Sequence, residues 1–453
     1  MRFIFLLLCC GLQSLIAQNA TYPKAQLAHE LDRITQVMET YHPNAYHYVD
    51  SVALRNLRNA LTADLPDQMA PVQAYRQINQ YVCAFGDGHT RVWDRQHRKT
   101  FIENGGLEFP YAVKIKNVDY IEAITPTGSQ QMLAINGIPA ADIVTTLRRH
   151  ASRETTALDD FLVSRNFPYY LWLAYGWEGT FMVEWRIGGR SVTEVIEGIS
   201  PLDRPQASSE EPTVSFQVLD NQIAYLKVAH FEKGLAYYRK KYAEAFALFR
   251  EADAQALIID VRNHDGGDQR AGEELARYFA KTPFRSFAYS EWKATPKFKK
   301  VFKDVYIPKP LHWALPLFKG LNPHTKAIYN AADHANARVE YKLRKPLAGK
   351  RFFDGPVTLL MDQNTFSAGT CFAAMFKDYE MGTIIGQESG SLANFHADGL
   401  LRMQIKDLDL VLQISNSYLV RPSGEETPQP VQPDVYLSPE LDALAHALQL
   451  ARK

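Results

Sequence analysis

Apolar residues recur at helical spacing in the first part of the chain. Leu27, Leu31 and Ile34 fall on one face of a helix that the pattern extends over residues 26–65, with an interruption at His42 and the proline that follows it. A second helical pattern covers residues 71–82, and the loop 85–90 then leads into a strand-like stretch at 91–93. We therefore predict a helical N-terminal region over residues 18–105.

The pattern changes to short strands from about residue 107. Strands are predicted at 111–115, 120–124, 132–135, 180–187 and 191–196, and a helix at 140–150. Residues 200–212 hold three prolines and an acidic pair, which is typical of a linker. These features predict a β-rich module over residues 106–205.

Strands and helices alternate in the third part of the chain. Strands at 223–228 and 256–261 alternate with helices at 235–251 and 270–279, and the alternation resumes with strand 357–361, helix 366–379 and strand 383–386. Further strands are expected at 401–405 and 409–415. This rhythm predicts an α/β core over residues 213–445, so we expect a multi-domain α+β chain.

A basic, aromatic segment interrupts the core at residues 291–351. It contains 14 Lys and Arg against 4 Asp and Glu, a net charge of 14 − 4 = +10, and its aromatic residues include Trp292, Phe298, Phe302, Tyr306 and Trp313. We favour a solvated insertion or lid whose aromatic side chains pack locally. An anion-binding surface is the alternative.

Charge and the amino terminus restrict the function classes and the compartment. The 453 residues contain 50 basic and 50 acidic side chains, a balance that argues against a dedicated nucleic-acid binder. Residues 1–17 resemble a secretory signal peptide, and no later segment is apolar enough to be a transmembrane helix. We expect an exported protein, periplasmic or extracellular. Because Leu8 is a poor residue before a lipidated Cys9, no lipid anchor is expected.

Ser367 is the first candidate for chemistry. It lies in Asn-Thr-Phe-Ser-Ala-Gly, residues 364–369, between a continuous apolar strand and a predicted helix. At a helix N-terminus, unpaired backbone N–H groups can stabilise an oxyanion that develops beside the hydroxyl. Taken alone, a serine at this position is more often a helix cap.

A pair of glycines follows another buried strand of the same core. In Asp-Val-Arg-Asn-His-Asp-Gly-Gly, residues 260–267, Gly266 or Gly267 can bring a backbone N–H close to a ligand. Together with the amide of Ala368, one of these glycines would complete an oxyanion hole.

Other reactive residue types have simpler interpretations. His230, His264 and His396 lack the spacing of metal ligands, so we expect no metal site and no cofactor. Cys371 is expected to be a packed thiol, and the sequence leaves open whether it pairs with Cys83.

The two core motifs together resemble the serine peptidase family of C-terminal processing, or tail-specific, proteases and the related core of tricorn protease. The match extends over residues 223–434 and includes Gly-Gln-Glu-Ser-Gly at 386–390 and Gln-Pro-Asp-Val at 432–435. Upstream, Gly-Asp-Gly-His-Thr at 86–90 resembles the family's N-terminal signature, and residues 133–147 resemble half of its PDZ-like domain. The resemblance implies a crotonase/ClpP-like spiral catalytic core beside a PDZ-like module.

The resemblance also implies roles for individual residues. Ser367 would be the nucleophile, and His89 would be its general base as in the tricorn-like branch, because residues 388–394 hold no lysine for a Ser-Lys dyad. Glu426, or alternatively Glu425, would orient the imidazole. One departure is Gly88, which stands where the tricorn-like site has a serine.

We therefore expect an exported serine endopeptidase that acts on a peptide or protein through an acyl-enzyme intermediate. Two other functions remain open on the same scaffold. One is an inactive protein that binds a peptide or an apolar ligand in the cleft, and the other is an esterase-like hydrolase.

Overall fold

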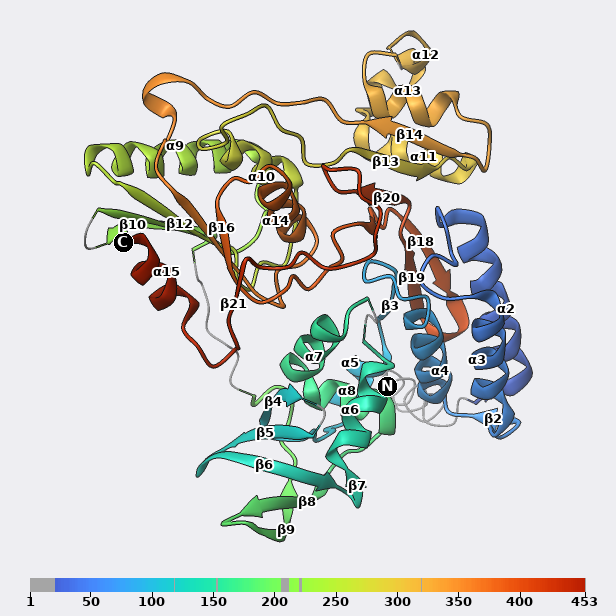
Figure 1. The fold of residues 1–453 in the computed structure, drawn as a ribbon. Coiled ribbons are helices and arrows are strands. Elements are labelled where there is room, and N and C mark those ends of the chain that lie inside the picture. Colours follow the sequence, from blue (N-terminus) through green and yellow to red (C-terminus); the bar gives the residue numbers. More distant parts are fainter. Residues whose placement is uncertain are drawn as a thin grey trace, which may run out of the picture.

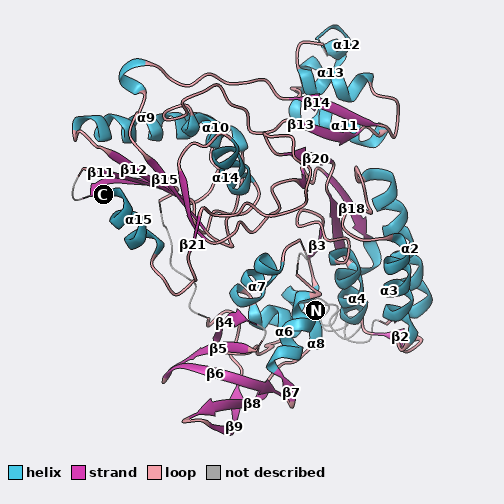
Figure 2. Cartoon of the chain, in the orientation of Figure 1, coloured by secondary structure: helices cyan, strands magenta, loops and turns pink. Residues whose placement is uncertain are grey.

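The structure is a computed structural model that describes residues 21–117, 119–151, 154–204, 212–219, 222–318 and 320–452. The predicted leader at 1–17 lies outside the described residues. None of the described helices is both long enough and apolar enough to cross a lipid bilayer. Figure 1 shows the layout, and Figure 2 separates the helix-rich and strand-rich parts.

Helices predominate in the N-terminal region, and a strand joins this region to a later part of the chain. Its helices are α2 (Lys24–Tyr41), α3 (Ser51–Ala63), α4 (Pro71–Cys83) and α5 (His97–Glu103), with the short strands β1 (Tyr22–Pro23) and β2 (Gln68–Met69). Strand β3 (Arg91–Asp94) pairs antiparallel with β19 (Leu410–Ile414), which also pairs with β18 (Leu401–Ile405). The loop at residues 85–90 is thereby fixed beside the core.

The next part of the chain is an antiparallel sheet covered by helices. Its strands are β4 (Ala112–Asn117), β5 (Tyr120–Thr125), β6 (Gly128–Ile135), β7 (Ile138–Pro139), β8 (Thr180–Ile187) and β9 (Arg190–Glu197). The helices are α6 (Ala140–Arg148), α7 (Thr156–Arg165) and α8 (Phe167–Tyr175), of which the sequence pattern predicted only the first. The helices and the sheet pack together around a separate core, which includes Val163 and Phe167 of the helices and Trp185 of β8.

The core is a six-stranded, mainly parallel sheet. Its order is β10 (Val214–Leu219), β11 (Ile223–Val228), β12 (Ala256–Asp260), β15 (Val357–Met361), β16 (Thr383–Gly386) and β21 (Val435–Tyr436), and only the β10–β11 pair is antiparallel. Helices α9 (Leu235–Glu251), α10 (Gln269–Ala276) and α14 (Ala368–Asp378) cover one face, and α15 (Ala443–Ala451) packs on the other. Burial on both faces explains the continuous apolar runs of β12 and β15.

The parallel pairing places the two core motifs together. Asp260 at the end of β12 is opposite Leu360 near the end of β15, so the glycine turn and the serine segment leave the sheet at the same edge. The predicted α/β class and the multi-domain α+β organisation are confirmed.

The segment at residues 291–351 folds as a lid beside this edge. Strands β13 (Tyr289–Lys293) and β14 (Asn336–Glu340) join β20 (Ser417–Val420) and β17 (Phe395–Ala397) in one sheet. The helices between β13 and β14 are α11 (Pro296–Tyr306), α12 (Leu315–Phe318) and α13 (Pro323–Asn330). Short 3₁₀ turns at Lys309–Ala314, Gly349–Arg351 and Lys406–Leu408 complete the described elements.

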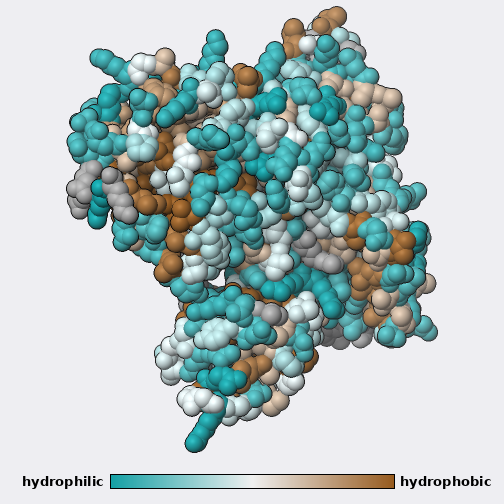
Figure 3. All heavy atoms as spheres, viewed as in Figure 1, coloured by the Kyte–Doolittle hydropathy of each residue, from teal (hydrophilic) through white to brown (hydrophobic). Residues whose placement is uncertain are grey.

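The aromatic side chains of the lid include a buried set and two, Tyr306 and Trp313, that are more than half exposed. Trp292, Phe298 and Phe302 are buried, and the rings of Trp292 and Phe298 stack with centroids 5.8 Å apart. Trp313 is instead 79% exposed near the outer tip around α12, where hydrophobic atoms reach the surface at the top of Figure 3. The part of the lid that contains Trp292, Phe298 and Phe302 therefore packs into a hydrophobic core.

Candidate active site

Ser367 stands at the junction where β15 gives way to α14. Its backbone has φ 53° and ψ −118°, so the helix begins at Ala368 and not at residue 366 as the sequence pattern predicted. A positive φ is unfavourable for a residue with a side chain and persists only where the surroundings enforce it. Here the Ser367 N–H donates to Ser391 Oγ at 3.0 Å, and the preceding N–H, of Phe366, donates to the His264 carbonyl. The Ser367 hydroxyl therefore does not cap α14: its side chain accepts no hydrogen bond from the first N–H groups of the helix.

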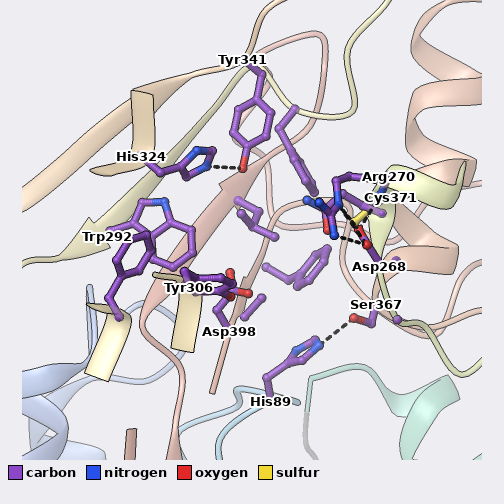
Figure 4. A pocket seen from close by; sticks show the side chains of 18 of the residues that line it. His89, Asp268, Arg270, Trp292, Tyr306, His324, Tyr341, Ser367, Cys371 and Asp398 are labelled. Atoms are coloured by element: carbon purple, nitrogen blue, oxygen red, sulfur yellow. Dashed lines mark hydrogen bonds and ion pairs between the residues drawn. The ribbon is translucent and has the colours of Figure 1, made fainter. Parts of the chain in front are cut away.

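His89 meets this hydroxyl from the other end of the chain. Its Nε2 lies 3.0 Å from Ser367 Oγ, a hydrogen-bond distance (Figure 4). The imidazole lies between the rings of Phe366 and Phe395, nearly parallel to both, with centroids 4.8 and 5.2 Å away. The two rings fix the plane of the imidazole by packing.

Burial sets the protonation state of His89. It lowers the pKa of the imidazole to about 4, an effect that the nearby Asp87 carboxylate opposes and Arg91 reinforces. The ring is therefore neutral at neutral pH, with a lone pair available on one nitrogen. Its other nitrogen, Nδ1, is buried and has no hydrogen-bond partner among the described residues.

Asp87 organises the loop that carries His89. Its carboxylate accepts the His89 backbone N–H at 2.9 Å, the hydroxyl of Thr90, and a bond from His42 Nε2 at 3.2 Å. Burial would raise the pKa of Asp87, but the bond and the charge from His42 hold it well below its usual range. Asp87 is thus a buried carboxylate two residues from the imidazole, and it holds the backbone rather than the ring.

Glu154 explains the glycine at position 88. Its carboxylate accepts the Gly88 N–H at 3.1 Å and the Leu392 N–H at 2.9 Å, so it joins the histidine loop to the loop that contains Ser391. A Cβ at position 88 would lie 2.0 Å from Glu154 Oε2, so a side chain there would require the Glu154 carboxylate or the loop to move. Burial raises the pKa of Glu154 to about 8, against the lowering effect of these two amide bonds.

Two backbone N–H groups of the cavity lining, those of Ala368 and Gly267, donate no hydrogen bond within the described chain. Ala368 is the first residue of α14, and within the described chain its N–H has no acceptor. The Gly266 N–H is already used, because it donates to His264 Nδ1 at 3.1 Å. Gly267 forms an isolated parallel bridge with Phe231, in which residues 266 and 268 make the bonds and the Gly267 N–H points away. Gly267 is therefore better placed than Gly266 to be a donor.

Gly266 has a steric role instead. A Cβ on it would lie 2.7 Å from the Ser367 Cβ and 3.4 Å from the Ala368 nitrogen. Its φ of 105° is also one that favours glycine. A side chain here would fill the space next to the serine hydroxyl.

A cavity of about 760 Å³ opens over Ser367, His89, Ala368 and Gly267. The lid provides one side of it through residues that include Trp292, Phe302 and Tyr306 (Figure 4). No lysine is among the described residues that line it. A serine with a neutral histidine at hydrogen-bond distance, two amides and a roofed cavity form a site suited to acyl transfer.

The structure does not bring the two predicted glutamates to the imidazole. Glu426 is exposed on the loop after β20 and accepts a hydrogen bond from the Tyr289 hydroxyl, while Glu425 is also exposed and lies 3.7 Å from Arg421. Neither forms a hydrogen bond with His89. The structure thus brings together Ser367, His89, Ala368 and Gly267, with Gly266 packed beside the serine.

The remaining candidates lie outside the cavity or pack within the core. His264 is fully buried against Phe231, and burial lowers its pKa to about 3. Cys371 is buried beside the cavity, burial raises the pKa of its thiol, and no disulfide joins it to Cys83. In the described part of the chain, no three His, Cys, Asp or Glu side chains gather as a metal site would require.

Sequence reasoning did not identify Ser391, Glu154 or the amide-holding role of Asp87. Only Asp87 had a local signal, since it stands two residues before the histidine in the same short motif. Glu154 belongs to the segment between α6 and α7. Its role depends on how the module at residues 106–205 packs against the loops of Gly88 and Leu392.

Comparisons with known proteins bear on the core and on the fold. Residues 222–437 match the model of peptidase family S41. A crystal structure of a CPAF mutant superposes with a TM-score of 0.64 at 13% identity, covering 91% of this chain and 93% of that one. Mature CPAF complexed with lactacystin gives a TM-score of 0.59 at 14% identity, with 91% and 94% covered. At these identities the likeness concerns the fold. No curated protein matches the sequence.

Replacement of Gly88 by serine tests the link through Glu154. The new side chain would collide with Glu154 Oε2 and displace the histidine loop, so Gly88→Ser should slow fluorophosphonate labelling of Ser367 by about 100-fold. Gly88→Ser/Glu154→Ala should label at least about 10-fold faster than Gly88→Ser, since the obstruction is gone. Equal labelling of Gly88→Ser and the wild type would show that Glu154 does not restrict this position.

The depressed pKa of His89 predicts an unusual pH profile. Because the neutral imidazole is the base, the second-order rate of Ser367 labelling should rise with a midpoint near pH 4 and be level by about pH 6. Glu154→Gln is the control, since its carboxyl titrates near pH 8 and any inflection there should disappear. A midpoint near 6.5, the ordinary value for histidine, would contradict the burial argument.

Proposed function

We propose that this chain, whose core at residues 222–437 belongs to peptidase family S41, is an exported serine endopeptidase with a Ser367–His89 site. The observation that carries the proposal is the 3.0 Å approach of His89 Nε2 to Ser367 Oγ at the N-terminus of α14. The predicted leader at residues 1–17 motivates export.

Acylation begins with proton transfer from Ser367 Oγ to His89 Nε2. The oxygen attacks the carbonyl carbon of a peptide bond, and the Ala368 and Gly267 amides stabilise the oxyanion of the tetrahedral intermediate. The imidazolium then returns its proton to the leaving amine as the C–N bond breaks. A water molecule, deprotonated by the same nitrogen, releases the acyl group and regenerates the serine.

The imidazolium needs a nearby negative charge, and Asp87 is the residue that supplies it. The Asp87 carboxylate is buried, ionised and bonded to the His89 backbone, and it is the charge that favours the protonated ring. Glu426 had this role in the sequence-based hypothesis, but it lies at the surface with Tyr289. Asp87 acts through space, without a hydrogen bond to Nδ1.

The lid and the module at residues 106–205 would control how a substrate reaches Ser367. The lid forms part of the wall of the cavity that contains Ser367. The sheet and helix at residues 106–205, which the resemblance identifies as PDZ-like, would hold a C-terminus or an extended segment of the substrate. Glu154 and Thr155 connect that module to the catalytic loops, since Thr155 Oγ1 donates to the Gly390 carbonyl at 2.9 Å.

Labelling combined with a substrate survey tests the proposed function. A fluorophosphonate should label the wild type and not Ser367→Ala, and His89→Ala should lower peptide kcat/KM by about 10⁴-fold or more while the fold is kept. Circular dichroism of each variant provides the folding control.

The other outcomes of this survey identify the alternatives. A well-folded wild type that resists labelling at neutral pH would indicate a binding protein. Hydrolysis of small esters, with none across a diverse peptide library, would indicate an esterase. Full peptidase activity in His89→Ala would remove the histidine from the mechanism.

A further inference from the structure

One charged side chain in the cavity has no ionic partner. Besides its histidines, the described lining contains three ionisable groups with formal charge, Asp268, Arg270 and Asp398. Asp268 and Arg270 form an ion pair, in which Arg270 Nη2 lies 2.6 Å from Asp268 Oδ2. Burial lowers the pKa of both His89 and His324, so neither adds charge near neutral pH. Asp398 is therefore the carboxyl group of the lining that has no cationic partner in the described chain.

Asp398 lies directly after β17 and lines the cavity. Figure 4 shows it between Tyr306 of the lid and His89. Its carboxylate accepts a single hydrogen bond, from Ser417 Oγ at 2.7 Å, and no ion pair with it is formed in the described chain. Burial raises its pKa, and its proximity also contributes to a pKa of about 12 for Tyr306.

The backbone alone does not account for an aspartate at this position. Asp398 has φ 59°, a conformation that asparagine adopts equally well, and an asparagine oxygen would accept the same bond from Ser417. A carboxylate costs more to bury than an amide unless it is paired with a cation. The missing cation is the feature that points to a ligand.

The walls around this carboxylate are apolar. Phe287, Cys371, Phe395 and Leu419 belong to one buried cluster, and all four line the same cavity as Ser367 and Asp398. Lysine and arginine side chains combine a long aliphatic stem with a charged end, so a wall of this kind accommodates the stem and a carboxylate binds the end.

The basic residues of the lid do not compete for the site. The lid has a net charge of +10, yet its residues in the cavity wall include no lysine or arginine. They are instead aromatic, aliphatic or neutral polar, such as Trp292, Ile307 and Asn322. A cationic group that enters the cavity therefore meets a carboxylate and aromatic faces, both of which attract it.

We propose that Asp398 and the apolar wall beside it form a subsite that binds a lysine or arginine side chain of the peptide, close to the bond that Ser367 attacks. This inference rests on the proposed peptidase function, which it deepens by naming the substrate class. Substrates with a cationic side chain at one position next to the scissile bond should be preferred.

A matched peptide series tests the preference. Each position on either side of the scissile bond carries lysine or norleucine in turn, since norleucine keeps the aliphatic stem without the charge. At one position the lysine peptide should have at least about 10-fold higher kcat/KM, the range of a hydrogen bond to a charged group. Asp398→Asn should remove this advantage and change kcat/KM for the norleucine peptide by less than about threefold.

The control variant is Asp304→Asn. Asp304 is an acidic residue of α11 that does not line the cavity, and its carboxylate lies 3.9 Å from His312 Nδ1. This variant should keep the lysine preference. Because Asp398→Asn retains the turn and the Ser417 acceptor, activity on the norleucine peptide also reports that it is folded.

A binding measurement separates the subsite from catalysis. Titration calorimetry with Ser367→Ala should show that benzamidine binds at least about 10-fold more tightly than neutral benzamide, and Ser367→Ala/Asp398→Asn should lose the difference. Benzamidine binding of this kind without hydrolysis of any peptide would sustain the subsite and reject the peptidase. Hydrolysis with equal rates for lysine and norleucine at every position would reject the subsite and sustain the peptidase. Benzamidine binding no tighter than benzamide, with no hydrolysis, would reject both.

Discussion

The pairing of β3 with β19 is the constraint on which the site depends. His89 and Ser367 are separated by 278 residues, and no local structure connects them. β3 begins two residues after His89 and is bonded along its whole length to β19, while Gln413 Nε2 donates to the His89 carbonyl at 3.1 Å. Loss of this pairing would separate the base from the nucleophile even if the parallel core remained folded. The N-terminal helices therefore serve the chemistry by supporting one short strand.

The unfavourable backbone conformation of Ser367 is maintained by a network of hydrogen bonds, which extends to the loop of Ser391, to Glu154 and to the loop of Gly88. The positive φ of Ser367 is maintained by Ser391, and the loop of Ser391 is joined through Glu154 to Gly88 beside the base. Glu154 belongs to the module at residues 106–205, so the docking of that module is coupled to the geometry of the site. A preorganised site of this kind needs little rearrangement when charge develops on the substrate oxygen.

The sequence predicted the parts of this molecule that depend on local pattern. The apolar runs of β11, β12 and β15 and the helix after residue 235 were placed from periodicity, and the serine and glycine motifs followed from the same strands. Residues whose roles depend on docking were not predictable. Glu154 lies in an ordinary polar segment, and Glu426 was assigned only from the family resemblance, although the fold turns that loop towards Tyr289. The strands β13 and β14 were missed because basic and aromatic residues obscure their alternation.

The central claim is that Ser367, His89 and the amides of Ala368 and Gly267 form one acyl-transfer site. A crystal structure of the fluorophosphonate adduct tests it most directly. The account predicts phosphorus bonded to Ser367 Oγ, with a phosphoryl oxygen within about 3.2 Å of the Ala368 and Gly267 nitrogens and His89 Nε2 still beside Oγ. An adduct on another residue, or a phosphoryl oxygen directed away from both amides, would contradict it.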